Sequence, residues 1–319
     1  MQEKTVTVII NTYPRNGRRE DLERALNSIT NQNYKDFKIL IIENFADDSK
    51  IKDIVSEYPD DNLRVICDPK KRLSYLFNLG WKNADTELLG YLADDAEADK
   101  TWLEGIVAEL NGDEKIGVIT GPLPSQCYPV GEMHRLYLAS QKNLVMKIIA
   151  WPYLNIVAEG NILKPGYFFE SGAYSLGTAL PEAVNFDRQE IDLATTTSMG
   201  TRRSIIEKIG GFDERFNFNH ADGDLFIRVK AAGFKIIFSP LVSAKHFMRL
   251  GPSRNAYFIG KDTGMFYRKD VRPKSLRGWI GAIINIKVLN LYWVYSALRL
   301  RDLSQLRGIS GFFEGFILL

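Results

Sequence analysis

The 319-residue chain has few cysteines, few histidines and almost no net charge, and these shortages exclude several classes of protein. Its two cysteines, Cys67 and Cys127, form neither a CxxC pair nor a zinc-binding pattern, so we expect reduced thiols and a cytoplasmic protein. The formal net charge of +2 argues against nucleic-acid binding over the whole surface. Residues 1–10 lack the basic segment and long apolar core of a secretory signal.

What the sequence contains is an average globular composition. Hydrophobic residues make up 45% and charged residues 25%, which excludes a disordered chain, a collagen and a coiled coil. At roughly 150 residues per domain, the length predicts about two domains, or one large α/β domain with an extension.

Strand-like apolar runs alternate with helical patterns through the first 120 residues. We expect strands at 5–11, 37–42, 63–66, 88–92 and 116–120. We expect helices at 19–31, 49–58 and 74–83, and a fourth that begins at the capping box Thr101-x-x-Glu104. This alternation predicts βαβ units and a parallel sheet covered by helices on both faces.

Polar residues follow three of the expected strands. They are Thr12 and Tyr13 after the first, Glu43 and Asn44 after the second, and Asp94 and Asp95 after the fourth. Turn preference alone explains any one of them. Ligands of such sheets bind beyond the carboxyl ends of the strands, so three polar strand ends favour a shared pocket.

The adjacent carboxylates Asp94 and Asp95 have a specific chemical use. Two charges this close raise each other's pKa unless a cation or donor neutralises them. A hard divalent ion such as Mg²⁺ binds through one or two carboxylates together with substrate phosphates. The alternative is a solvated acidic loop, because Glu97 and Asp99 continue the run.

The C-terminal segment differs from the rest in charge. Residues 268–319 hold nine basic and three acidic residues, a local charge of +6, which leaves −4 for residues 1–267. Within it, residues 278–298 are mostly apolar, with polar interruptions at Asn285, Lys287, Asn290 and Ser296.

A membrane-spanning helix is disfavoured for this stretch, because a central Lys costs roughly 2.5–3.5 kcal/mol in a bilayer. We expect a helix lying in the membrane interface, with aromatic side chains at headgroup depth, namely Trp279, Tyr292, Trp293 and Tyr295. A helical subdomain packed on the core explains the segment equally well.

Residues 6–121 resemble the nucleotide-binding half of an inverting family 2 glycosyltransferase with the GT-A fold. The resemblance rests on the segments VTVIINTYPRN, IIENFADDS, RLSYLFNLGWKNA and LLGYLADDAEADKTWLEG. It implies that Thr12, Tyr13 and Glu43 hold the base of a UDP- or dTDP-linked sugar and that Asn78 lies near the nucleotide.

Asp94 and Asp95 match the family's DxD-type motif, which implies Mg²⁺ or Mn²⁺ as the cofactor. The resemblance gives Asp94 to the ribose or the metal and Asp95 to the metal. The family usually has three consecutive aspartates at this point, and Ala93 replaces the first of them.

A second segment, residues 199–228, resembles the acceptor-side half of the same family and contains the motif GGFDE. The family usually has Glu-Asp-x-Asp after it, where this chain has Ala221, Asp222, Gly223 and Asp224. Inverting transfer needs a base for the acceptor hydroxyl, and the resemblance gives that role to Asp222. From spacing alone, a helix cap is an equal explanation for Asp222. Asp224 and Arg228 are spaced as a structural ion pair.

His246 ends the run 235–246, which we expect to be one strand. The resemblance implies that His246 completes the metal shell or contacts the diphosphate, although a lone His at a strand end is more often structural. Further along, Arg249, Arg254 and Lys261 could reach the phosphates, and an exposed loop explains them equally well.

We therefore expect an α/β protein with the GT-A fold. Residues 1–121 form the nucleotide-sugar-binding half, 122–265 the acceptor-binding and catalytic half of the same domain, and 266–319 a basic helical extension. The predicted function is hexosyl or deoxyhexosyl transfer to a glycan or lipid-linked acceptor near the cytoplasmic membrane, with a rhamnosyltransferase-like branch as one candidate.

Two other functions remain open. A non-catalytic nucleotide-sugar-binding or scaffold member is supported by Ala93 and Ala221, which replace acidic residues of the family pattern. A sugar-nucleotide pyrophosphorylase would need a Gly-rich phosphate loop after the first strand, and residues 12–17 match such a loop poorly.

Overall fold

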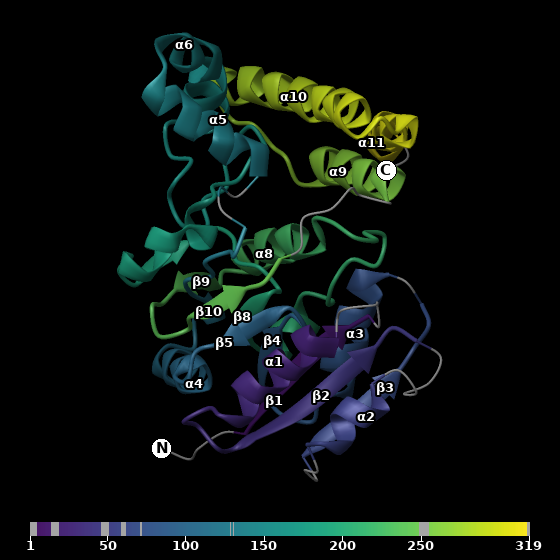
Figure 1. Cartoon of the computed structure of the whole chain (residues 1–319). Coiled ribbons are helices and arrows are strands. Elements are labelled where there is room, and N and C mark those ends of the chain that lie inside the picture. Colours follow the sequence, from purple (N-terminus) through teal and green to yellow (C-terminus); the bar gives the residue numbers. More distant parts are fainter. Residues whose placement is uncertain are drawn as a thin grey trace.

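The computed structural model describes residues 5–13, 19–45, 51–58, 62–70, 72–127, 129, 131–248 and 255–317. Within these ranges, eight strands form one sheet in the lower half of Figure 1, in the order β3-β2-β1-β4-β8-β6-β9-β7. Their bounds are β1 Val6–Thr12, β2 Phe37–Glu43, β3 Leu63–Cys67, β4 Leu88–Leu92, β6 Ile116–Thr120, β7 Gln189–Ile191, β8 Ser198–Arg202 and β9 Lys235–Phe238. Most neighbours are parallel, and β8 and β7 are antiparallel to theirs. The predicted α/β fold is confirmed.

Helices cover both faces of the sheet, as the alternating pattern predicts. In β1, Val8 and Ile10 point into an apolar cluster shared with α1 (Arg19–Thr30) and α4 (Trp102–Gly112), and Ile9 points into the opposite cluster with α3 (Leu73–Asn83) and α8 (Ala221–Ala231). Because successive side chains of a strand face opposite ways, a strand buried on both faces is apolar throughout.

The expected helix of residues 49–58 is shorter in the structure, where α2 spans Lys52–Ser56 and residues 49 and 50 lie outside the described ranges. The expected capping box at α4 is wrong. Thr101 occupies the N-cap position, but its side chain makes no capping hydrogen bond. Its hydroxyl donates instead to the backbone oxygen of Leu241 at 3.3 Å, a tertiary contact that the local pattern could not indicate.

The run 235–246 forms two strands and not one. Lys235–Phe238 is β9 of the main sheet, whereas β10 (Ala244–His246) pairs antiparallel with β5 (Ala96–Ala98) in a separate two-stranded sheet. β5 lies directly after Asp94 and Asp95, so the acidic run is not simply a solvated loop. Three residues are too few to show a strand period, which explains why the sequence did not reveal this pair.

The middle of the chain adds α5 (Gly131–Lys142), α6 (Leu144–Pro152), the π-helix η2 (Tyr153–Val157), two short 3₁₀ turns and α7 (Arg203–Lys208). Strands β7, β8 and β9 come from residues 122–265 and yet belong to the main sheet, so the sheet crosses the expected division at residue 121.

The C-terminal region is helical and lies at the upper end of Figure 1, with α9 (Ala256–Lys269), α10 (Leu276–Leu300), η5 (Leu303–Leu306) and α11 (Arg307–Ile317). Helices α9 and α11 touch backbone to backbone at glycines. A Cβ at Gly264 of α9 would lie 2.0 Å from the carbonyl oxygen of Phe312, and one at Gly315 of α11 would lie 2.0 Å from that of Lys261. The carboxylate of Glu314 pairs with the Lys261 ammonium at 2.7 Å.

This close packing predicts that Gly264→Ala lowers the free energy of unfolding by about 1–3 kcal/mol, the usual cost of overpacking a tight contact. Urea denaturation measures it. Gly112→Ala is the matched control, because no atom lies within 4 Å of a Cβ added at the end of α4. Equal stability of the two variants would contradict the glycine contact.

Candidate active site

The predicted polar strand ends meet at one edge of the sheet. The parallel register of β1 and β2 places Thr12 beside Glu43, and β4 pairs with β1 on its other side. The Thr12 hydroxyl donates a 2.9 Å hydrogen bond to Oδ2 of Asp94, and both side chains are buried. The backbone N–H of Asn44 donates to the Thr12 carbonyl at 2.9 Å. The ends of β1, β2 and β4 therefore lie together at one edge of the sheet, and a shared ligand pocket there stays a prediction.

Two further residues of the predicted base site lie at this edge. Glu43 is fully buried at the end of β2, and Tyr13 is half-buried just after β1. Contact of Thr12, Tyr13 and Glu43 with a nucleotide base stays a prediction.

The β5–β10 pair brings Asp95 and His246 together. His246 aligns with Ala96 in the register, and Nε2 of His246 lies 3.4 Å from Oδ1 of Asp95. The backbone N–H of Phe247 donates to the Asp95 carbonyl at 2.8 Å and fixes the approach. Both side chains remain partly exposed, 15% for Asp95 and 21% for His246. They are thus open to a ligand from the solvent side.

A carboxylate oxygen and an imidazole nitrogen at this spacing suit a divalent ion such as Mn²⁺. Within the described ranges, no group of three or more His, Cys, Asp or Glu side chains could hold a metal by itself. These two protein ligands therefore fit a metal ion that takes its other ligands from water and a diphosphate.

Asp222 lies in the first turn of α8, close to the same edge. The N-cap of α8 is His220, with a left-handed φ of 60°, so the interpretation of Asp222 as the cap is wrong. Its carboxylate accepts the Gly223 N–H at 2.9 Å. Burial raises the pKa of Asp222 above its ordinary value of 3.8, and the backbone N–H groups of Gly223 and Thr196 oppose that shift.

Thr196 connects this carboxylate to the strand-end cluster that contains Asp94. The next residue, Thr197, accepts a 2.9 Å hydrogen bond from the backbone N–H of Ala93, which directly precedes Asp94. Asp222 and the carboxylates after β4 are therefore neighbours across a single peptide segment.

Asp224 has the structural role predicted for it. It is fully buried and forms a 2.7 Å ion pair with Arg228 and a second pair with Lys269 of α9. Lys269 also pairs with Asp213 of the GGFDE segment at 2.7 Å. This network joins α8, α9 and the loop before α8.

Two residues that sequence reasoning missed hold the loop in front of Asp222. Asp262 of α9 is fully buried and accepts three consecutive backbone N–H groups, at 2.9 Å from Asn217, 2.7 Å from Phe218 and 3.0 Å from Asn219.

The second is His220. Its ring stacks on Phe266, with ring centroids 4.5 Å apart, and Nε2 lies 3.2 Å from the Thr263 hydroxyl. Burial lowers the pKa of His220 to about 4, so this ring is neutral at pH 7. No local pattern around Asp262 signals contacts with a loop more than forty residues earlier.

The side-chain amide of Asn78 is hydrogen-bonded entirely within the protein, and its predicted position near the nucleotide stays a prediction. Its amide nitrogen donates to the Phe212 carbonyl at 2.9 Å and to Glu214 at 2.8 Å, and its oxygen accepts from the Phe212 N–H and the Trp81 indole, both at 2.8 Å. These four bonds use the full capacity of the amide. Gly211 fits against it because a Cβ there would lie 2.6 Å from Oδ1 of Asn78. The amide thus holds the GGFDE turn against α3.

The structure brings none of the three predicted phosphate-binding residues to this edge of the sheet within the described part of the chain. Arg249 and Arg254 lie outside the described residues. Lys261 is on helix α9 and not in a loop, and it pairs with Glu314 of α11 at 2.7 Å, so its contact with phosphates stays a prediction.

Comparison with known proteins agrees with this geometry. Residues 7–210 match the family described as glycosyl transferase family 2. The O-antigen biosynthesis protein RfbC of Myxococcus xanthus is 24% identical over 223 residues, which are 69% of this chain and 16% of that protein. The chain thus spans about a sixth of that relative's length.

Two solved structures share the fold. The crystal structure of GalNAc-T7 with UDP, GalNAc and Mn²⁺ superposes with a TM-score of 0.59 and 14% identity, over 84% of this chain and 50% of that one. The mannosyltransferase PcManGT of Pyrobaculum calidifontis, in complex with GDP-Man and Mn²⁺, gives a TM-score of 0.56 and 15% identity, over 99% of this chain and 88% of that one.

The contacts of Asn78 predict a structural effect on substitution. Asn78→Ala should lower the free energy of unfolding by about 1–3 kcal/mol, because it leaves buried partners unpaired. Asn83→Ala, on the same helix, removes one exposed hydrogen bond to Leu79 and should change stability little. Urea denaturation compares the two. An Asn78→Ala protein of unchanged stability but weakened nucleotide affinity would favour the nucleotide contact instead.

The Asp95–His246 pair predicts that Mn²⁺ strengthens binding of a nucleoside diphosphate, measured by calorimetry with UDP, dTDP and GDP. Asp95→Asn should reduce that gain at least about tenfold, since even outer-shell changes at metal sites cost 10–100-fold. Asp99→Asn, an exposed carboxylate of the same acidic run, should leave it unchanged. Nucleotide affinity in the unaltered protein that is equal with and without Mn²⁺ would refute the metal site.

Proposed function

Because the chain belongs to glycosyltransferase family 2, we propose that it moves a sugar from a nucleoside-diphosphate-sugar to an acceptor hydroxyl with inversion at the anomeric carbon. The observation that carries this proposal is the position of Asp222. Its carboxylate has a raised pKa and lies next to the strand-end cluster that contains Asp94. A base beside a donor site is the arrangement that direct displacement needs.

We assign binding of the nucleotide-sugar donor to the polar residues at the strand ends. Thr12, Tyr13 and Glu43 would receive the base of a UDP- or dTDP-linked hexose or deoxyhexose, and Asp94 would face the ribose. Asp95 and His246, with the donor's diphosphate, would hold Mg²⁺ or Mn²⁺, and that ion supplies positive charge opposite the diphosphate. The Mn²⁺ named with both similar structures supports this assignment.

The acceptor side is assigned to Asp222. Its carboxylate accepts the proton of the acceptor hydroxyl while the hydroxyl oxygen forms a bond to the anomeric carbon. The bond from that carbon to the diphosphate oxygen breaks in the same step, and the diphosphate leaves with the electron pair. A raised pKa makes Asp222 a stronger base once it is ionised.

The acceptor is assigned to a glycan or a lipid-linked glycan made on the cytoplasmic side of the membrane. The name of the RfbC relative supports polysaccharide synthesis as the setting. A panel of nucleotide-sugars with Mn²⁺, assayed for donor hydrolysis, tests the reaction class and identifies the donor.

A non-catalytic nucleotide-sugar-binding protein is the second candidate. It is favoured by Ala93 and Ala221, which stand where the family usually has acidic residues. Saturable binding of a nucleotide-sugar without hydrolysis or transfer in any member of the panel would favour that candidate over catalysis.

Asp222→Asn should lower turnover at least ~100-fold, the lower end for loss of a general base, with donor affinity preserved. Because the pKa of Asp222 is raised in the folded protein, its ionisation costs stability at pH values above that pKa and costs nothing below the unfolded value. The melting temperature at neutral pH should therefore stay the same or rise in this variant.

Asp224→Asn is the contrasting variant, because it breaks buried pairs with Arg228 and Lys269 and should lower the melting temperature. Full activity of Asp222→Asn together with a lower melting temperature would show that Asp222 is structural.

A further inference from the structure

Helix α10 distributes its apolar and polar residues in the opposite way to an ordinary surface helix. The face buried against the protein carries mainly small or polar residues, namely Gly278, Gly281, Ala282, Asn285, Ser296 and Ala297. The exposed residues of α10 are mostly apolar and recur at helical spacing, namely Leu276, Ile280, Ile283, Leu291 and Leu298, with charged residues at Arg277, Lys287 and Arg299. A helix that only packed on a core would show the opposite arrangement.

Trp293 is an exception to the sequence-based expectation for this helix. It is buried against Gly308, where an added Cβ would lie 2.3 Å from its ring. Trp279, Tyr292 and Tyr295 are exposed, as an interfacial helix requires.

A second apolar helix lies beside α10 at the same end of the molecule (Figure 1). α6 buries only Ala150, whereas five of its large apolar side chains are more than half exposed: Leu144, Val145, Ile148, Ile149 and Trp151. This segment comes from the middle of the chain, so the apolar surface is not confined to the C-terminal extension.

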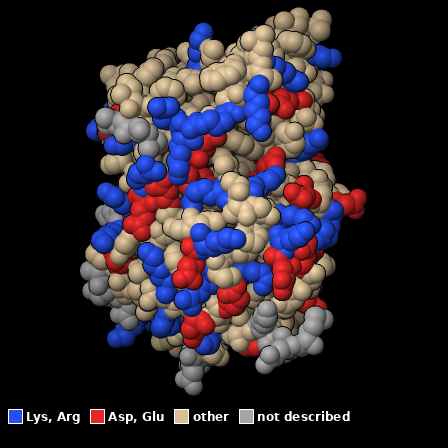
Figure 2. Space-filling model, turned by 180° about the vertical axis from the view of Figure 1, so that it is seen from behind, with Lys and Arg blue, Asp and Glu red and all other residues tan. Residues whose placement is uncertain are grey.

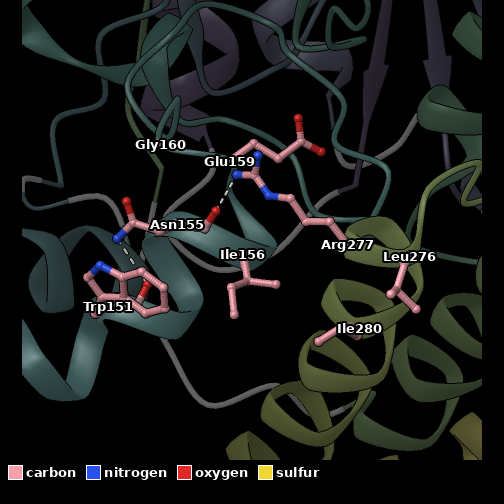
Figure 3. Close-up of a pocket in the computed structure, with 8 residues that line it drawn as sticks. All are labelled: Trp151, Asn155, Ile156, Glu159, Gly160, Leu276, Arg277 and Ile280. Carbon is pink, nitrogen blue, oxygen red and sulfur yellow. Dashed lines mark hydrogen bonds between the residues drawn. The ribbon is translucent and has the colours of Figure 1, made fainter.

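A groove of about 520 Å³ joins the two helices. Its walls include Trp151 and Ile156 from one segment and Leu276 and Ile280 from α10, and Figure 3 shows Arg277 reaching across it to the backbone oxygen of Asn155. The groove makes α6 and α10 one continuous surface, which we call the apolar end.

Basic residues accompany this surface. Lys142, Lys147 and Lys287 are exposed and form no ion pair with any residue in the described part of the chain. In Figure 2 the upper end of the molecule is mostly tan, with blue Lys and Arg side chains below it. This charge complements an anionic surface.

We propose that the apolar end binds the interface of a lipid bilayer that contains anionic lipids, with α6 and α10 lying in the plane of the membrane. Apolar side chains with tryptophan and tyrosine at the edges and lysine around them are the composition of interfacial helices. By length and composition alone, α10 could cross a membrane. It does not do so here, because one face is covered by protein and Lys287 lies at its middle.

Co-sedimentation with vesicles of phosphatidylcholine and phosphatidylglycerol tests the proposal. The full-length protein should bind these vesicles, and binding should weaken in 1 M salt, where the Debye length is about 3 Å. The pairs Ile148→Glu with Ile149→Glu, and Leu291→Glu with Leu298→Glu, should each reduce vesicle binding by at least about tenfold.

Val184→Glu with Leu241→Glu is the matched control. Both side chains are about half exposed, and they lie outside α6 and α10, so this variant should bind vesicles normally. Equal melting temperatures of all variants would show that lost binding is not unfolding. Absence of vesicle binding by the full-length protein, or equal loss in the control, would overturn the proposal.

Charge is tested separately with Lys147→Gln and Lys287→Gln together. This variant should bind anionic vesicles more weakly and with less salt dependence, whereas Lys52→Gln with Lys115→Gln, two exposed lysines elsewhere, should behave as the unaltered protein. A dimer in sizing chromatography that the α6 and α10 variants dissociate, with no vesicle binding, would show that the apolar end binds a second copy, and the bilayer proposal would fail.

Discussion

The position of the candidate base depends on one buried carboxylate. Asp262 accepts the backbone N–H groups of residues 217–219 in succession, and so it fixes the loop that leads into His220 and then Asp222. Burial raises the pKa of Asp262, and the three N–H donors oppose that shift. These hydrogen bonds help to hold His220 in a left-handed conformation, which is unfavourable for most residues with a Cβ.

Helix α9, which carries Asp262, also connects the two ends of the molecule. Toward the sheet, Lys269 bridges Asp213 and Asp224. On its other side, glycines bring its backbone against α11, which packs under α10 at Gly308 and Trp293. The candidate site and the apolar end are therefore attached to one helix, so a membrane bound at that end would give the site a fixed orientation toward a lipid-linked acceptor.

The features that could be predicted from the sequence are the ones that short-range patterns determine. Alternating apolar runs located the first five long strands and their helices, and carboxylates at a strand end located Asp94 and Asp95. The pairing of β5 with β10 was not predictable, because strands of three residues show no period and their partners are about 150 residues apart. Asp262 was missed for a related reason: its contacts depend on tertiary packing alone. The exposure of α6 was also hidden, since an apolar run reads equally well as a buried helix.

Asp222 and Asp224 show how environment divides the roles of two carboxylates on one helical turn. Asp224 forms ion pairs with Arg228 and Lys269, so two positive charges oppose its negative charge. Within the described part of the chain, backbone N–H groups are what opposes the cost of burying Asp222, and its pKa is raised. When the negative charge of a buried carboxylate is only partly compensated, taking up a proton is more favourable for it than for a carboxylate in water. The burial that makes ionised Asp222 unfavourable for stability also suits this carboxylate to its proposed role as the base.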